Sequence, residues 1–280
     1  MPTPPQQSRS LSRQHGEGSK VAGPETVDAA SKDVAQASSP AFPSAAYRSG
    51  WKPLLRKMSP FIKICGITNV EDALWAAHCG ATAIGLVFAE ESPRRITLGS
   101  AAEILSVVPE TLVRVGVFVN EPLEHLNDCV AKLGLHFAQL HGEESPDYCR
   151  QVKGKVIKAF RVSSERDLES LQQYPADAFL LDAFTPGKRG GSGRTFDWSL
   201  AVKAKEHGVP IILSGGLNPD NVAEAVQTVS PWGVDASSGV EISPGKKDHD
   251  KVRLFVENAI RAFSAISAVP PREALPCSEE

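Results

Sequence analysis

The stretch Gly233-Val-Asp-Ala-Ser-Ser-Gly239 decides the fold of this chain, together with Leu213-Ser-Gly-Gly216 shortly before it. Each stretch follows a short apolar run and precedes a helical pattern. Each also presents glycines and small hydroxyl side chains, where backbone N–H groups can surround a phosphate. In a (βα)8 barrel, the loops after the last two strands form such a site. The two stretches therefore predict the phosphate-binding end of a barrel.

Short apolar runs alternate with amphipathic segments from residue 61 onward, which is typical of βα units and of a parallel sheet. We expect strands at residues 61–66, 83–88, 113–119, 137–140, 156–160, 178–181, 210–213 and 233–236. We expect helices near residues 70–79, 100–107, 122–133, 145–152, 164–173, 198–207, 219–229 and 248–263. This repetition predicts an α/β protein with a single (βα)8 TIM barrel. A doubly wound open sheet is the alternative, but no G-x-G-x-x-G turn follows the first strand.

Local signals mark the ends of some elements. Asn69 and Asp72 suit a capping-box-like start for the first helix. Asn218 and Pro219 place a cap and a first-turn proline before the seventh helix. The glycine-dense segment 185–193 suits a mobile lid that excludes water, with plain disorder as the alternative.

The two ends of the chain differ from the barrel in composition. Residues 1–57 are rich in Ser, Pro, Ala and Gln, so we expect a disordered extension. Its first twenty residues lack the hydrophobic stretch of a secretory signal. A plastid-type transit peptide and a true start at Met58 are alternatives, although acidic residues argue against the first. We expect a barrel domain at 58–264, a flexible tail at 265–280 and a cytoplasmic location, with the plastid as the alternative.

Composition and spacing argue against several classes of partner. The net charge of −3 gives no basic field for nucleic acid. No apolar run reaches the roughly 18 residues that a membrane span needs. The cysteines show no paired spacing, which favours reduced thiols. No spacing of metal ligands is present. We therefore expect no nucleic acid, no membrane and no metal.

Two inward-facing side chains are candidates for chemistry, because reacting groups of a barrel lie at the carboxyl ends of its strands. Alternation along the first strand places Lys63 and Cys65 inward, opposite Ile62 and Ile64. The same rule points Asp182 inward at the end of the sixth strand. A carboxylate there is costly to bury without a function or a partner. The alternatives are a small core residue for Cys65 and a helix cap or solvated loop residue for Asp182.

Polar residues after two other strands are candidates for binding. Gln139 and His141 share the inward face of the fourth strand, and His141 could orient a substrate. Arg94 or Arg95, after the second strand, could clamp a carboxylate with two hydrogen bonds. The alternatives are a structural, hydrogen-bonded histidine and solvated loop charges.

Motifs in order along residues 61–263 resemble phosphoribosylanthranilate isomerase. They are Lys63-Ile-Cys-Gly-Ile-Thr68, Ser92-Pro-Arg94, Gln139-Leu-His-Gly142, Leu181-Asp182, Gly190-Gly-Ser-Gly193 with Phe196-Asp-Trp198, Leu213-Ser-Gly-Gly-Leu-Asn218 and Val234-Asp-Ala-Ser-Ser-Gly-Val-Glu241. The resemblance implies a monomeric or homodimeric (βα)8 enzyme of tryptophan biosynthesis that needs no cofactor. The implied reaction is that of an intramolecular oxidoreductase. It converts N-(5-phosphoribosyl)anthranilate to 1-(2-carboxyphenylamino)-1-deoxyribulose 5-phosphate, so the partner is a phosphorylated small molecule.

The resemblance also implies roles for residues of this sequence. Cys65 would be the general base, Asp182 the general acid and Arg94 the residue that holds the anthranilate carboxylate. The further substrate-binding residues that it implies are Gln139, His141, Gly215, Gly216, Asp235, Ser237, Ser238 and Gly239. For this chemistry the acid must be protonated and the thiol ionised near neutral pH. We expect a nearby cation, with Lys63 as the candidate, to lower the pKa of Cys65.

Two other functions compete with this one. Another phosphosugar barrel, such as indoleglycerol-phosphate synthase or a histidine-pathway ribonucleotide isomerase, would share the phosphate loops. Such an enzyme would need a lysine or a second aspartate in place of Cys65. A catalytically silent phosphate-binding module is the third hypothesis, and the presence of both Cys65 and Asp182 argues against it.

Overall fold

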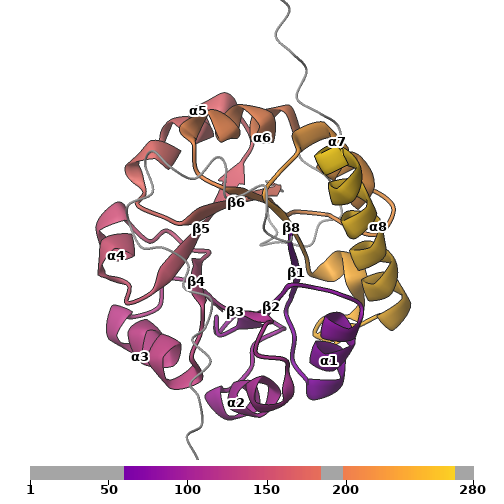
Figure 1. Ribbon diagram of the computed structural model, residues 1–280. Helices are drawn as coiled ribbons and strands as arrows, with labels where there is room; N and C mark the ends of the chain where they lie inside the picture. Colours follow the sequence, from indigo (N-terminus) through magenta and orange to yellow (C-terminus); the bar gives the residue numbers. More distant parts are fainter. Residues whose placement is uncertain (1–59, 184–197, 269–280) are drawn as a thin grey trace, which may run out of the picture. The chain divides into compact units, whose positions relative to one another are not determined.

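The computed structural model describes residues 60–183 and 198–268, and there the parallel strands form a closed barrel in chain order. The strands are β1 (Phe61–Cys65), β2 (Ala83–Val87), β3 (Val113–Phe118), β4 (Phe137–Leu140), β5 (Lys155–Val162), β6 (Ala178–Ala183), β7 (Ile211–Leu213) and β8 (Gly233–Ala236). The ring closes where β1 pairs with β8, with Phe61 opposite Gly233. The TIM-barrel fold is confirmed, because every expected strand is present (Figure 1).

Helices surround this ring of strands (Figure 1). They are α1 (Val70–His78), α2 (Leu98–Val107), α3 (Leu123–Leu133), α4 (Pro146–Gln151), α5 (Glu165–Glu169), α6 (Trp198–Ala204), α7 (Val222–Val229) and α8 (His249–Ala268). Short 3-10 segments follow α5 and α6, within the ranges expected for the fifth and sixth helices. None of the helices in the described ranges is long and apolar enough to cross a membrane.

The strands bury both faces. Outward residues such as Ile62 and Ile64 belong to the large core that packs beneath the helices. Inward residues form a separate apolar layer that contains Phe61, Phe137 and Leu180. Because successive side chains of a strand alternate, this confirms the predicted facing of β1 and places Lys63 and then Cys65 above that layer. The barrel interior is therefore apolar at one end and polar at the carboxyl ends of its strands.

One expected helix cap is confirmed and one is wrong. Asn69 caps α1, because its side-chain oxygen accepts a hydrogen bond from the Asp72 backbone N–H at 2.8 Å. The expected start of α7 at Asn218-Pro219 is wrong, since the helix begins at Val222. Asn218 instead accepts a hydrogen bond from the Asp220 backbone N–H at 2.8 Å. The hydrogen bond of the Asn218 side chain thus stabilises a non-helical turn at the residues where the first turn of α7 was expected.

A small antiparallel hairpin follows the barrel and was not expected from the sequence. Its strands are β9 (Glu241–Ser243) and β10 (Lys246–Lys247), joined through Gly245 at φ +82°. The Thr68 hydroxyl donates to the carbonyl of Gly245. The Lys247 backbone N–H donates to Asp72 at 2.9 Å. The hairpin is thereby fixed against the segment that follows β1.

Three expectations fall partly or wholly outside the described ranges. They concern the extension at 1–57, the lid at 185–193 and most of the tail at 265–280. Within that tail, residues 265–268 continue α8, which ends at Ala268.

Candidate active site

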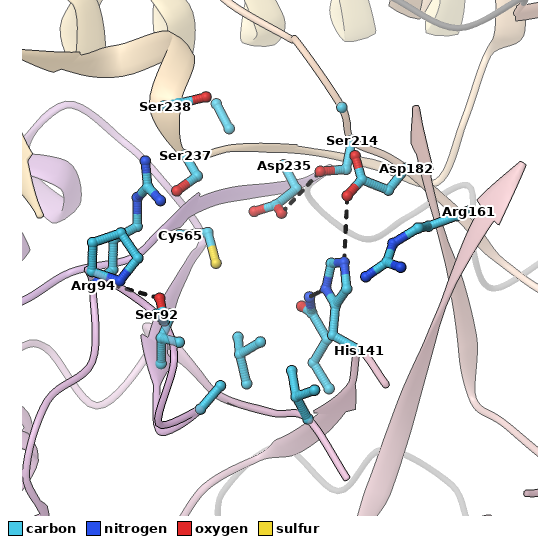
Figure 2. A pocket seen from close by; sticks show the side chains of 18 of the residues that line it. Cys65, Ser92, Arg94, His141, Arg161, Asp182, Ser214, Asp235, Ser237 and Ser238 are labelled. Atoms are coloured by element: carbon cyan, nitrogen blue, oxygen red, sulfur yellow. Dashed lines mark hydrogen bonds and ion pairs between the residues drawn. The ribbon is translucent and has the colours of Figure 1, made fainter. Parts of the chain in front are cut away.

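The residues to which the resemblance gives catalytic or binding roles all line one pocket at the carboxyl ends of the strands. Arg95, the alternative to Arg94, does not line it and pairs with Glu90 at 3.5 Å. The volume of the pocket is about 490 Å³, a size typical of small-molecule sites. Figure 2 shows Cys65 of β1 and Asp182 of β6 pointing into this space from different sides. Active sites of TIM barrels lie at this end. The structure thus brings the residues together, while the role of each stays a prediction.

Cys65 occupies space that a glycine on the neighbouring strand leaves free. A Cβ at Gly85 of β2 would lie 2.7 Å from Cys65 Sγ and 3.0 Å from Lys63 Cε. Burial raises the pKa of the Cys65 thiol, and the charge of Asp235 adds to this, although Lys63 opposes both. The expectation that a cation would bring this pKa below its ordinary value is wrong. Lys63 acts in the expected direction, but loss of hydration outweighs it.

Lys63 and Asp235 form a buried ion pair below the thiol. Lys63 Nζ lies 2.6 Å from Asp235 Oδ1, and the two side chains are 0% and 5% exposed. Burial alone would lower the pKa of Lys63, but the charges of Asp235 and Cys65 raise it. The Ser214 hydroxyl donates to the other Asp235 oxygen at 3.3 Å. Asp235, predicted to bind substrate, thus lines the pocket and also neutralises Lys63.

Lys63→Met should therefore lower the free energy of unfolding by about 3–5 kcal/mol, because it leaves Asp235 buried without a partner. It should also raise the pKa of Cys65 further, since Lys63 is the main group that opposes burial. Urea unfolding measures the first effect. The pH dependence of Cys65 alkylation, followed by mass spectrometry, measures the second. Adding Asp235→Asn should recover part of the stability, and an unchanged thiol pKa would rule out electrostatic coupling between Lys63 and Cys65.

Three polar side chains form a chain that ends at the predicted general acid. The Gln139 amide lies 3.1 Å from His141 Nδ1. His141 Nε2 in turn lies 3.3 Å from Asp182 Oδ2, and Figure 2 shows these two side chains facing each other. With the amide donating to Nδ1, the hydrogen of the neutral imidazole is on Nε2, facing Asp182. His141 thus contacts the candidate acid, whereas its expected role was to orient the substrate. The buried Gln139 Oε1 has no hydrogen-bond partner in the described part of the chain.

The predicted phosphate loops have backbones that suit glycine. Gly215 and Gly216 have φ values of +77° and +75°, which favour residues without a Cβ. A Cβ at Gly239 would lie only 2.0 Å from the carbonyl oxygen of Leu217. The two loops therefore approach each other closely at Gly239, beside Ser237 and Ser238. This proximity supports one anion site shared between them.

Arg94 reaches the same side of the pocket, next to Ser237 and Cys65 (Figure 2). Its guanidinium donates to both carboxylate oxygens of Glu241, from Nε at 2.8 Å and from Nη2 at 2.6 Å. Gly66 makes room for it, because a Cβ there would lie 2.5 Å from Arg94 Cδ. One edge of the Arg94 guanidinium, which was predicted to bind the substrate carboxylate, is thus already bonded to Glu241.

Sequence reasoning missed two buried ion pairs, which do not line the pocket, and one residue that does. Glu241 and Lys247 pair at 2.7 Å, and Glu144 and Lys158 pair at 2.9 Å, in both cases almost fully buried. Arg161 lines the pocket, from the end of β5. Lys158 interrupts the apolar run of β5, and this is a signal in the sequence for its pair with Glu144. The others show in the sequence only as charges near strand ends.

The fold and this site together define a (βα)8-barrel with a small-molecule pocket, lined by both polar and apolar residues, at the carboxyl ends of its strands. A family model described as N-(5'-phosphoribosyl)anthranilate (PRA) isomerase matches residues 62–258. The chain belongs to this family. An isomerase of that name from Pelobacter propionicus is 51% identical over 198 residues, which cover 71% of this chain and 94% of the relative. One from Trichlorobacter lovleyi is 50% identical, with 72% and 98% covered.

Solved structures agree with this assignment. Phosphoribosyl anthranilate isomerase from Thermotoga maritima matches with a TM-score of 0.68 and 47% identity, covering 71% of this chain and 97% of that one. A second structure is a complex with reduced 1-(o-carboxyphenylamino)-1-deoxyribulose 5-phosphate. It has a TM-score of 0.65, 45% identity and the same coverage. A third structure concerns monomers of a dimeric isomerase from Thermotoga maritima.

Proposed function

We propose that this chain isomerises N-(5'-phosphoribosyl)anthranilate to 1-(2-carboxyphenylamino)-1-deoxyribulose 5-phosphate in tryptophan biosynthesis, by general acid–base catalysis. The supporting observation is one pocket that holds a thiol, a carboxyl group and two closely packed glycine loops. Membership of the isomerase family and a relative's complex with a reduced form of this product agree with it. The reaction makes the protein an aldose–ketose type of intramolecular oxidoreductase.

The proposed mechanism uses two side chains in successive steps. Asp182, in contact with His141, protonates the ribose ring oxygen, and the C1′–O bond breaks to leave an iminium at C1′. The thiolate of Cys65 then takes the C2′ proton, and the electron pair moves to the nitrogen to give an enolamine. Tautomerisation of the enolamine gives the C2′ ketone.

The rest of the pocket would hold the substrate at its two charged ends. The loops at Gly215, Gly216 and 237–239 would bind the phosphate through backbone N–H groups and hydroxyls. Arg94 would bind the carboxylate of the anthranilate ring. A homodimer or a monomer, and a cytoplasmic location, stay predictions.

The direct test is the activity of the purified full chain. Phosphoribosylanthranilate is fluorescent, so its consumption can be followed continuously, and the product can be identified by mass spectrometry. We expect consumption with the carboxyphenylamino ketose as the product. A chain that binds the reduced product analogue without consuming the substrate would be a silent binding module. Turnover only of another phosphosugar would favour a different barrel enzyme.

A further inference from the structure

Glu241 holds Arg94 along one edge and leaves another edge for a ligand. Nε–H and one Nη2–H of Arg94 donate to Glu241. The second Nη2–H and the Nη1–H beside it form the end of the guanidinium, which can bind a second carboxylate with two parallel hydrogen bonds. The Glu241 side chain is 4% exposed and that of Arg94 is 19% exposed. One carboxylate is therefore buried behind Arg94, while Arg94 itself lines the pocket.

Glu241 is itself fixed by a buried lysine. Lys247 Nζ lies 2.7 Å from Glu241 Oε1 and 2.5 Å from the carbonyl oxygen of Cys65. Burial acts to raise the pKa of Glu241, but the hydrogen bonds from Arg94 and the charge of Lys247 hold it below its ordinary value. Glu241 is therefore anionic at neutral pH. A continuous set of contacts thus joins Arg94 to the backbone of the predicted catalytic thiol.

The backbone around this set is also constrained. Gly66, at φ +75°, allows the stem of Arg94 to pass over it. The β9–β10 hairpin, which supplies Glu241 and Lys247, is bonded to Thr68 and Asp72. A guanidinium held in one orientation loses less entropy when it binds a carboxylate than one that is free to turn.

We propose that Glu241 is a positioning residue, which fixes Arg94 so that the pocket prefers a substrate whose aromatic ring carries a carboxylate. This deepens the proposed function and rests on it. If Glu241 positions Arg94, neutralising Glu241 should change the affinity for a carboxylate in the opposite direction to the one expected from its charge alone. Removing the negative charge of Glu241 leaves more positive charge beside the ligand, which by itself would tighten the binding of a carboxylate. Loss of positioning would weaken it.

The test compares two ligands on the full-length wild-type chain and on Glu241→Gln, by isothermal titration calorimetry. One ligand is reduced 1-(o-carboxyphenylamino)-1-deoxyribulose 5-phosphate, and the other is the same compound without the ring carboxyl group. We expect Glu241→Gln to weaken the first ligand by about tenfold, the size of one charge-assisted contact, and the second by less than about twofold. Glu241→Asp keeps the charge but shortens the reach, and it should weaken the first ligand in the same direction.

Glu144→Gln is the matched control. Glu144 is another buried glutamate paired with a lysine at this end of the barrel, and no contact joins it to Arg94. Its substitution should leave the ratio of the two dissociation constants unchanged. Tighter binding of the carboxylated ligand by Glu241→Gln, or equal weakening of both ligands in both Glu241 variants, would overturn the proposal. If the wild-type chain bound neither ligand, the proposed function itself would fail.

Discussion

Cys65→Ala should lower kcat by about a thousandfold or more, with a change in KM of less than about threefold, because the variant lacks the base that removes the C2′ proton. The cavity left by the thiol is small, and Cys65 belongs to a small apolar cluster with Val87, Val117 and Ala89. The loss should therefore appear in turnover rather than in substrate binding. Steady-state kinetics with phosphoribosylanthranilate measures both constants.

The pH profile gives this prediction a second readout. Because burial raises the pKa of Cys65, the thiol of the free protein is protonated at neutral pH. The kcat/KM of the wild type should then rise with pH through the neutral and alkaline range, and Cys65→Ala should lack this rise. A cationic iminium beside the thiol favours the thiolate, which would allow proton transfer near neutrality once the sugar ring has opened.

Cys129→Ala is the control for packing. Cys129 is a fully buried cysteine of α3 that does not line the pocket. Its substitution removes the same atom from the core, so it should lower stability slightly and leave kcat and its pH profile unchanged. Turnover of Cys65→Ala within about tenfold of the wild type would show that another group accepts the proton.

The sequence predicts the positions of these groups better than their electrostatics. Strand alternation correctly predicts that Cys65 and Asp182 point inward. Successive side chains of a strand point to opposite faces, so the few apolar residues that face the helices identify the inward positions. The shift in the pKa of Cys65 depends instead on how much water the closed barrel removes and on Asp235. Asp235 belongs to β8, which pairs with β1 in space but is far from it in the sequence. Neither quantity is visible in the residues around Cys65.

The pairing of Arg94 is a similar case. An arginine after the second strand predicts a cation at the pocket, and the structure places it there. Its partner Glu241 comes from the hairpin after β8, which has only a few residues and no recognisable strand pattern. The cap at Asn218 fails for a related reason, because Asn218 and Asn221 bond to the turn that carries Gly216. Where a loop is shaped by contacts with other loops, local signals lose their predictive value.

Asp182→Asn should lower kcat by about a thousandfold, with an unchanged affinity for the reduced product analogue, because asparagine has no acidic proton for the ribose oxygen. Asparagine has nearly the same shape, and its carbonyl oxygen can still accept from His141 Nε2, which lies 3.3 Å from the present carboxylate. Asp177→Asn is the matched control. That aspartate precedes β6 at the opposite end and accepts a hydrogen bond from the Val156 backbone N–H, which asparagine can also accept.

The two active-site variants should fail at different steps, and this separates their roles. If Asp182 opens the ring and Cys65 acts afterwards, Cys65→Ala still forms the open-chain iminium, whereas Asp182→Asn stops before it. Cyanoborohydride reduces an iminium to a stable amine, which mass spectrometry can quantify in a single turnover with excess enzyme. We expect trapped amine above the enzyme-free background with Cys65→Ala and none above background with Asp182→Asn. The reverse pattern would exchange the two assignments, and equal trapping would mean that Asp182 does not open the ring.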